Sequence, residues 1–188
     1  MKTAVILHGK PDKDKYYADS GPSESNGEWL PWLQKQLIIR GVLAQTPEMP
    51  KPYEPYYDAW REVFERFEIN EKTILVGHSC GAGFLVRWLS ERPLVKVGKV
   101  VLVAPSLGID WDHKGFFDFE MDPKLVKRTM GLSILAAKDD RPAIMEAAHK
   151  IADTIPGVHL QELETGGHFT QESMGKLDFP ELLQEILR

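Results

Sequence analysis

A serine lies at the centre of the pattern G-x-S-x-G, at residues 77–81. The pattern follows an apolar, strand-like run and precedes a segment whose apolar side chains recur at helical spacing. A sharp turn between a strand and a helix strains the backbone of the serine and pushes its hydroxyl out of the sheet. Gly77 and Gly81 suit such a turn, because side chains at these positions would collide across it. In this context the pattern predicts that Ser79 stands on a nucleophile elbow.

A serine hydroxyl is a weak nucleophile unless a base removes its proton and a third group orients that base. In folds with this elbow, the acid and then the histidine follow the serine along the chain, each after a later strand. Asp139 and Asp140 follow one strand-like run, and His168 follows the last one. The sequence therefore predicts Ser79 as nucleophile and His168 as base. Neighbouring residues that leave a strand point in opposite directions, so periodicity leaves both aspartates open as the acid.

The other histidines are weaker candidates for the base. His8 follows the first strand and is expected to shape the loop there, whereas His78 lies inside the elbow with its side chain directed elsewhere. The remaining three are expected to be surface or packing residues: His113, His149 and His159.

Negative charge that develops on a substrate oxygen needs hydrogen-bond donors beside the serine. The backbone N–H of the residue after the nucleophile and an N–H from the loop after the first strand usually supply them. These positions are Cys80 and Lys10, so we expect their backbone N–H groups to form an oxyanion hole. The thiol of Cys80 is expected to be buried and inert.

Aromatic residues in two irregular stretches have no fixed role from the sequence. Those between 106 and 122 either line an acyl pocket or pack a crossover against the sheet. Tyr16 and Tyr17, in the long polar stretch at 10–27, are candidates for the border of the cleft. The residues of the first group are Trp111, Phe116, Phe117 and Phe119.

Apolar β-rich runs alternate with segments of helical period along the whole chain. This alternation is typical of a parallel sheet with helices on both faces, and it predicts about six strands. No repeat or linker divides the sequence, so we expect one α/β domain over residues 1–188. The predicted strands are 3–7, 42–46, 73–76, 99–103, 132–136 and 158–163; the main predicted helices are 29–40, a segment from Pro55, a segment after 81, a segment through 144–155, and a last one from Pro180.

Composition excludes several classes of protein. Lys and Arg number 23 against 28 Asp and Glu, a formal charge of 23 − 28 = −5 that disfavours a nucleic-acid or anionic-lipid surface. No apolar run approaches the roughly 18 residues of a membrane span, and the run at 4–7 is too short for a signal peptide. The single cysteine excludes an internal disulfide and a thiolate-rich metal site. We therefore expect a cytoplasmic protein, a monomer, without a metal.

The same residues resemble a known family, the small α/β-hydrolase-fold serine hydrolases of the YdeN and retinoblastoma-binding-protein-nine type. The resemblance covers nearly the whole chain. It rests on the turn at Gly9, the WLPW segment at 29–32, the KTI segment at 72–74, the GHS segment at 77–79, the aspartate pair at 139–140 and the GHF segment at 167–169.

The resemblance has two implications and one limit. It implies a compact α/β-hydrolase fold with the sheet order 2-1-3-4-5-6, and it implies that Asp140, the second aspartate of the pair, is the acid. It does not imply the retinoblastoma protein as a partner, because residues 67–71 lack the Leu-x-Cys-x-Glu pattern of the mammalian relative.

We therefore expect a serine hydrolase that acts on carboxylic esters of small molecules by a Ser-Asp-His triad, through an acyl-enzyme and without a cofactor. Two alternatives remain open. The same triad could transfer the acyl group to an alcohol or amine instead of water, or the chain could be a catalytically silent binding module on a hydrolase scaffold.

Overall fold

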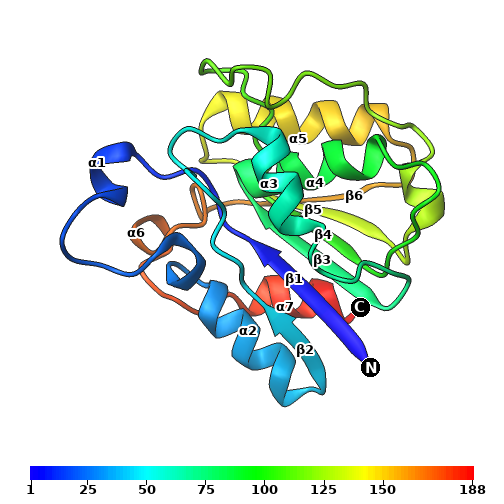
Figure 1. Ribbon diagram of the computed structural model, residues 1–188, viewed down its shortest axis with the longest axis horizontal. Coiled ribbons are helices and arrows are strands. Elements are labelled where there is room, and N and C mark those ends of the chain that lie inside the picture. Colours follow the sequence, from blue (N-terminus) through cyan, green and yellow to red (C-terminus); the bar gives the residue numbers. More distant parts are fainter.

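The computed structural model describes all residues from 1 to 188. Its centre is one six-stranded sheet in which every neighbouring pair of strands is parallel. The strand order is β2-β1-β3-β4-β5-β6, which confirms the expected fold class and order (Figure 1). The strands are β1 (Lys2–Leu7), β2 (Val42–Gln45), β3 (Thr73–His78), β4 (Val100–Val103), β5 (Leu132–Ala137) and β6 (His159–Leu163).

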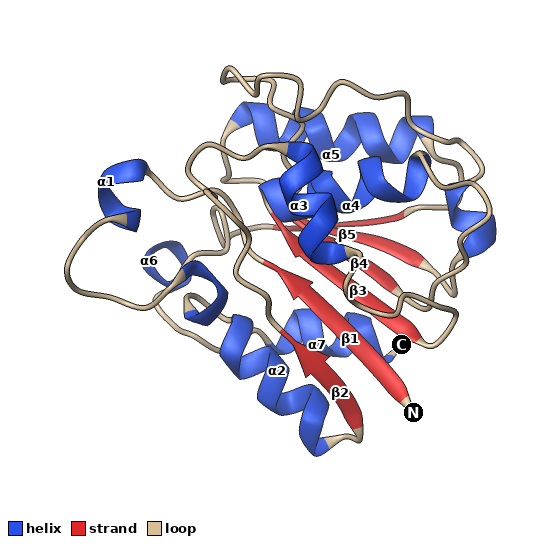
Figure 2. Cartoon of the chain, in the orientation of Figure 1, coloured by secondary structure: helices blue, strands red, loops and turns tan.

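Helices cover both faces of the sheet (Figure 2). On one face lie α3 (Tyr57–Phe64), α4 (Cys80–Ser90) and α5 (Pro142–Thr154). On the other face lie α2 (Leu30–Ile39) and α7 (Pro180–Leu187). Pro31, Pro142 and Pro180 stand in the first turns of α2, α5 and α7, where the missing N–H of proline costs no hydrogen bond.

The four inner strands, β1, β3, β4 and β5, are buried on both faces because helices cover each face, whereas the edge strands β2 and β6 are partly exposed. Successive side chains of a strand point to opposite sides, so Val5 and Leu7 of β1 join one core cluster, while Ala4 and Ile6 join the other. The first cluster fills the space under α3 and α4, and the second lies under α2 and α7. This explains why the inner strands are continuous apolar runs in the sequence rather than alternating ones.

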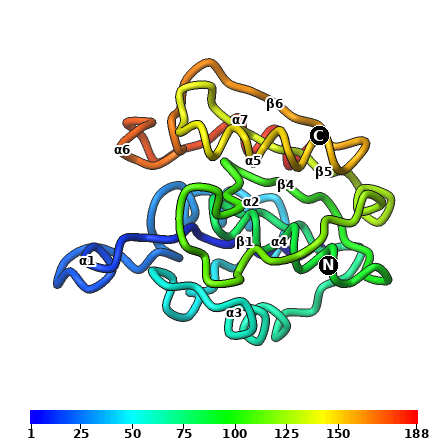
Figure 3. The backbone as a smooth tube through the Cα atoms, turned by 90° about the horizontal axis from the view of Figure 1, so that it is seen from above, coloured from blue at the N-terminus to red at the C-terminus, as the bar shows by residue number.

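Two short helices were not predicted from the sequence. The first, α1 (Lys13–Tyr16), lies in the polar stretch at 10–27 and protrudes at one end of the molecule (Figures 1 and 3). The second, α6 (Gln171–Met174), follows His168 and begins with a capping box between Thr170 and Ser173. Each helix has only four residues, too few for a helical period to be visible in the sequence.

The parallel arrangement brings the segments that follow the strands to one edge of the sheet. The residues after β1, β3, β5 and β6 all leave the sheet there, although the ends of β1 and β6 are 163 − 7 = 156 positions apart in the chain. None of the helices has the length and apolar character needed to cross a membrane.

Candidate active site

Ser79 occupies a strained turn between β3 and α4. Its backbone angles are φ 52° and ψ −114°, a conformation that side-chain-bearing residues rarely adopt. A Cβ atom on Gly77 would lie 2.6 Å from the backbone of Ala82, and one on Gly81 would lie 2.5 Å from the carbonyl oxygen of His8. The turn therefore has the geometry expected of a nucleophile elbow. Only glycine fits at positions 77 and 81, two residues before and two residues after the serine.

His168 lies between Ser79 and Asp140. Its Nε2 is 2.8 Å from Oγ of Ser79, and its Nδ1 is 2.8 Å from Oδ2 of Asp140. The Asp140 side chain is only 1% exposed, and that of His168 is 22% exposed. The other carboxylate oxygen of Asp140 accepts the N–H of Arg141 at 2.7 Å. These contacts fix a tautomer in which Nδ1–H donates to the carboxylate and Nε2 accepts from the serine hydroxyl.

Asp139 points away from this chain of hydrogen bonds. Its carboxylate accepts the N–H of Gly167 at 2.8 Å and the N–H of Gly166 at 3.3 Å. Asp139 thus holds the turn that carries His168, and Asp140 is the aspartate that contacts the imidazole. The geometry chooses between two residues that the strand period left equivalent.

Two buried residues donate hydrogen bonds to the backbone of the loop that carries His168. The Nε2–H of His78 donates to the carbonyl oxygen of His168 at 2.7 Å, and the indole N–H of Trp29 donates to the carbonyl oxygen of Phe169 at 3.1 Å. Burial lowers the pKa of His78 to about 3, so its ring is neutral at ordinary pH. The sequence placed the His78 side chain away from the reaction, without indicating that it holds the loop of His168, and it assigned no role to Trp29.

The loop after β1 lies directly against the elbow. A Cβ atom on Gly9 would lie 3.1 Å from Cβ of Ser79, so the two backbones approach closely. The Lys10 N–H donates to no backbone carbonyl oxygen, and the Cys80 N–H is one of the first N–H groups of α4, which have no partner inside the helix. Lys10 and Ser79 line the same small cavity, and Cys80 follows the serine directly, so the expected oxyanion donors belong to segments that border Ser79.

His8 holds the backbone of this loop through hydrogen bonds of its buried ring. The Met49 N–H donates to Nε2 of His8 at 2.9 Å, so the ring proton is on Nδ1, which donates to the carbonyl oxygen of Gly9 at 2.7 Å. Burial also lowers the pKa of His8 and keeps it neutral. The histidine thus fixes the loop that ends at Lys10.

The thiol of Cys80 and the other three histidines take no part in these hydrogen bonds. Cys80 is buried, and burial raises the pKa of its thiol, so the thiolate is disfavoured. His149 bonds Glu162 at 3.0 Å on the surface, His159 lies 4.0 Å from Glu185, and His113 belongs to the crossover before β5. No group of three or more His, Cys, Asp or Glu side chains is placed to bind a metal ion.

A small cavity of about 80 Å³ opens beside Ser79 and His168. Its wall includes Glu24 and Glu28 from the long polar stretch and Thr170 from the segment before α6, none of which the sequence identified. Their only signal was the unusual length of the stretch at 10–27. Of the aromatic residues left open, Phe116 and Phe117 pack in the core, whereas Trp111 is half-buried and lines a neighbouring cavity.

A six-stranded parallel sheet of this order, with a strained turn at Ser79 after β3 and a histidine after β6, defines an α/β-hydrolase fold. The chain belongs to the serine hydrolase family, whose model matches residues 17–186. It is 29% identical to the hydrolase YdeN of Bacillus subtilis over 170 residues, which are 85% of this chain and 87% of YdeN.

Solved structures agree with this assignment. The ydeN gene product of B. subtilis superposes with a TM-score of 0.81 at 25% identity, covering 100% of this chain and 99% of the other. Two further solved structures, one of them an esterase, share the fold at lower identity. EaEST of Exiguobacterium antarcticum has a TM-score of 0.64 at 15% identity, covering 100% of this chain and 92% of the other, and Est1E of Butyrivibrio proteoclasticus, in its structure with ferulic acid, has 0.63 at 14%, covering 100% and 90%.

Proposed function

We propose that this serine hydrolase cleaves carboxylic esters of small molecules through an acyl-enzyme on Ser79. The observation that carries the proposal is the continuous hydrogen-bond chain from Oγ of Ser79 through His168 to Asp140, with both links at 2.8 Å. A hydroxyl hydrogen-bonded to an oriented imidazole, in a chain of the serine hydrolase family, is the arrangement that nucleophilic acyl transfer requires.

In the first half-reaction, Nε2 of His168 takes the proton of Ser79 while Oγ attacks the ester carbonyl carbon. The carbonyl oxygen becomes an oxyanion, which accepts hydrogen bonds from the N–H groups of Cys80 and Lys10. Asp140 stabilises the imidazolium that forms. The carbon–oxygen bond to the leaving group then breaks as His168 returns the proton to the departing alcohol, and the acyl group stays on Oγ.

In the second half-reaction, His168 removes a proton from a water molecule, whose oxygen attacks the acyl carbon. The bond to Oγ breaks, Ser79 recovers its proton from His168, and the carboxylic acid leaves. The catalytic groups in both half-reactions are side chains and backbone N–H groups of this chain, and the other reactants are the ester and water.

The decisive experiment is labelling with a fluorophosphonate, followed by mass spectrometry of the adduct and by a turnover assay on a short-chain nitrophenyl ester. We expect the adduct on Ser79 and a loss of turnover of about 10⁴–10⁶ in Ser79→Ala and His168→Ala. The exposed Ser20→Ala serves as control and should keep both signals. Full turnover in Ser79→Ala would exclude the proposal.

Transfer to another acceptor is measured in the same assay. Adding an alcohol and analysing the products separates hydrolysis, which gives the free acid, from acyl transfer, which gives a new ester. Predominance of the new ester at low alcohol concentration would replace the hydrolase proposal by an acyltransferase.

A further inference from the structure

The cavity at the nucleophile is too small to hold a whole substrate. Its volume of about 80 Å³ compares with about 300–1,000 Å³ for a typical small-molecule site. A second cavity, of about 440 Å³, adjoins it, and Lys10 lines both. A substrate whose carbonyl group lies on Ser79 therefore has room for its other end past the side chain of Lys10.

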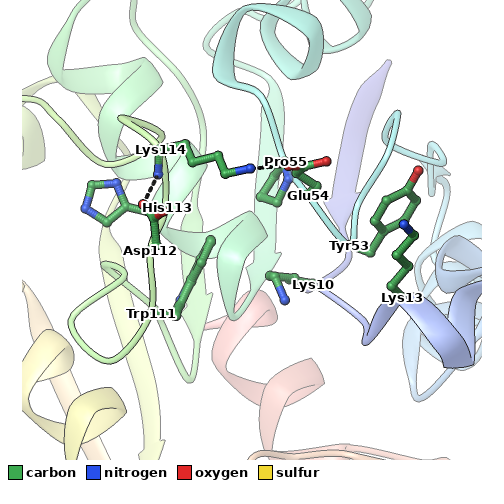
Figure 4. Close-up of a pocket in the computed structure, with 9 residues that line it drawn as sticks. All are labelled: Lys10, Lys13, Tyr53, Glu54, Pro55, Trp111, Asp112, His113 and Lys114. Atoms are coloured by element: carbon green, nitrogen blue, oxygen red, sulfur yellow. Dashed lines mark hydrogen bonds and ion pairs between the residues drawn. The ribbon is translucent and has the colours of Figure 1, made fainter.

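The second cavity has aromatic and cationic walls (Figure 4). Trp111 from the crossover before β5 forms one side, and Tyr53 from the segment before α3 stands on the other. The ammonium group of Lys10 is 5.3 Å from the centre of the Trp111 ring, and that of Lys13 is 5.8 Å from the centre of the Tyr53 ring. Each aromatic ring thus has a positive charge next to it.

The positive charges in this cavity exceed the negative ones. Glu54 is paired with Lys114, whose side chain reaches from the crossover to the segment before α3, and Asp112 accepts the backbone N–H of Lys114 at 3.1 Å. No carboxylate oxygen lies within 4.0 Å of the ammonium groups of Lys10 and Lys13. Three lysines against two acids leave a net positive charge, in a protein whose formal charge is −5.

Another cavity that adjoins the one at Ser79 lacks the aromatic walls and the excess positive charge. It shares Lys15, Glu28 and Thr170 with the central one, and no hydrophobic residue lines it. Its cation is already compensated, because Nζ of Lys15 lies 3.8 Å from the carboxylate of Glu28. Of the two neighbouring cavities, only the one next to Lys10 offers both flat apolar surface and uncompensated positive charge.

We propose that the cavity lined by Lys10, Lys13, Tyr53 and Trp111 is a substrate subsite for a flat, unsaturated group that bears a carboxylate. This inference rests on the proposed function, because it assigns the far end of the ester that Ser79 attacks. The rings contact the faces of the flat group, while the two ammonium groups pair with its negative charge.

A matched pair of esters tests the subsite by kinetics. Monoethyl terephthalate carries a carboxylate on an aromatic ring, and ethyl 4-carbamoylbenzoate is its uncharged counterpart of the same shape. We expect kcat/KM to favour the carboxylate by about fivefold at low salt, because the two exposed ammonium groups can each form a surface ion pair with it. Raising the ionic strength should reduce the ratio.

Substitutions locate the source of the preference. The single variant Lys13→Gln and the double variant Lys10→Gln/Lys13→Gln should bring the ratio of the two kcat/KM values stepwise toward unity. Both substitutions keep the backbone N–H of residue 10, which the proposed mechanism uses. Lys35→Gln removes an exposed lysine of α2 and controls for the change in net charge. A ratio that is near unity in the wild type, or that the lysine variants leave unchanged, overturns the inference while ester hydrolysis itself still stands.

Binding separates the subsite from the reaction. Ser79→Ala protein is titrated with both esters by calorimetry, and the charged ester should bind several-fold more tightly in a manner that depends on Lys13. If the wild type neither labels at Ser79 nor hydrolyses the nitrophenyl ester, this binding result would support the subsite and contradict the proposed function. Equal or absent binding of the two esters at millimolar concentration would overturn the subsite.

Discussion

His78, the residue before the candidate nucleophile, is hydrogen-bonded to the backbone of the candidate base. Its Nε2–H donates to the carbonyl oxygen of His168 at 2.7 Å, and the two rings lie 5.1 Å apart. The turn that carries Ser79 therefore also holds the loop that carries His168. The distance between nucleophile and base is fixed by a contact inside the protein and does not depend on a bound substrate.

The first prediction concerns this contact. His78→Phe removes the donor and should lower kcat about tenfold with little change in KM, because the base loses its position while the cavity remains. His78→Gln keeps an N–H donor and should recover most of kcat. Steady-state kinetics with circular dichroism as a check of folding decides the matter. Equal kcat values in the two variants would show that the hydrogen bond positions nothing.

The second prediction concerns stability at mildly acidic pH. Burial lowers the pKa of His78 to about 3 in the folded state. His78 therefore binds a proton near pH 6.5 in the unfolded chain, but only near pH 3 in the folded protein. Stability contributed by the neutral ring is complete above pH 6.5 and is lost as the pH falls from 6.5 toward 3. The lowered pKa of His8 acts in the same direction.

Urea unfolding at pH 7 and pH 5 measures this effect. The contribution of His78 should fall by about 2 kcal/mol between pH 6.5 and pH 5, at about 1.4 kcal/mol per pH unit. His78→Phe should show a correspondingly smaller pH dependence, whereas the surface variant His149→Gln should follow the wild type. A wild-type free energy of unfolding that is constant over this range would contradict the prediction.

The third prediction separates the two aspartates. Asp140→Asn should lower kcat by about 10³–10⁴, because the amide favours the wrong imidazole tautomer. Asp139→Ala should cost only about tenfold through a looser turn at Gly166 and Gly167. Asp139→Asn keeps an oxygen that accepts their N–H groups and should restore activity. A larger loss in Asp139→Asn than in Asp140→Asn would reverse the assignment.

The fourth prediction concerns the strain at Ser79. Its φ of 52° costs about 1–3 kcal/mol for a residue with a side chain and little for glycine. Ser79→Gly should therefore be about 1 kcal/mol more stable than Ser79→Ala in urea unfolding. At the helical Ser90 the same comparison should give the opposite order, since glycine is the poorer helix former. Glycine less stable than alanine at position 79 would mean that the turn is relaxed.

Several features of this protein are determined by its sequence alone. The apolar runs predict the strands because both faces of a parallel sheet are covered, and helical spacing predicts the long helices between them. The elbow is also local, since a strand, Gly77, Gly81 and a helix are contiguous in the chain. The chain order of serine, aspartate pair and histidine then follows from the order in which strands of this fold end.

Tertiary structure alone decided which side chains meet at the sheet edge. Asp139 and Asp140 are equivalent by period, and the backbone of the loop after β5 sends one to the glycine turn and the other to the imidazole. The contacts of Trp29 and His78 with the loop of His168 join residues 140 and 90 positions apart. Likewise, the cavity next to Lys10 has walls from three separate segments of the chain. Contacts of this kind arise when the sheet and its helices pack together, so no local pattern in the sequence encodes them.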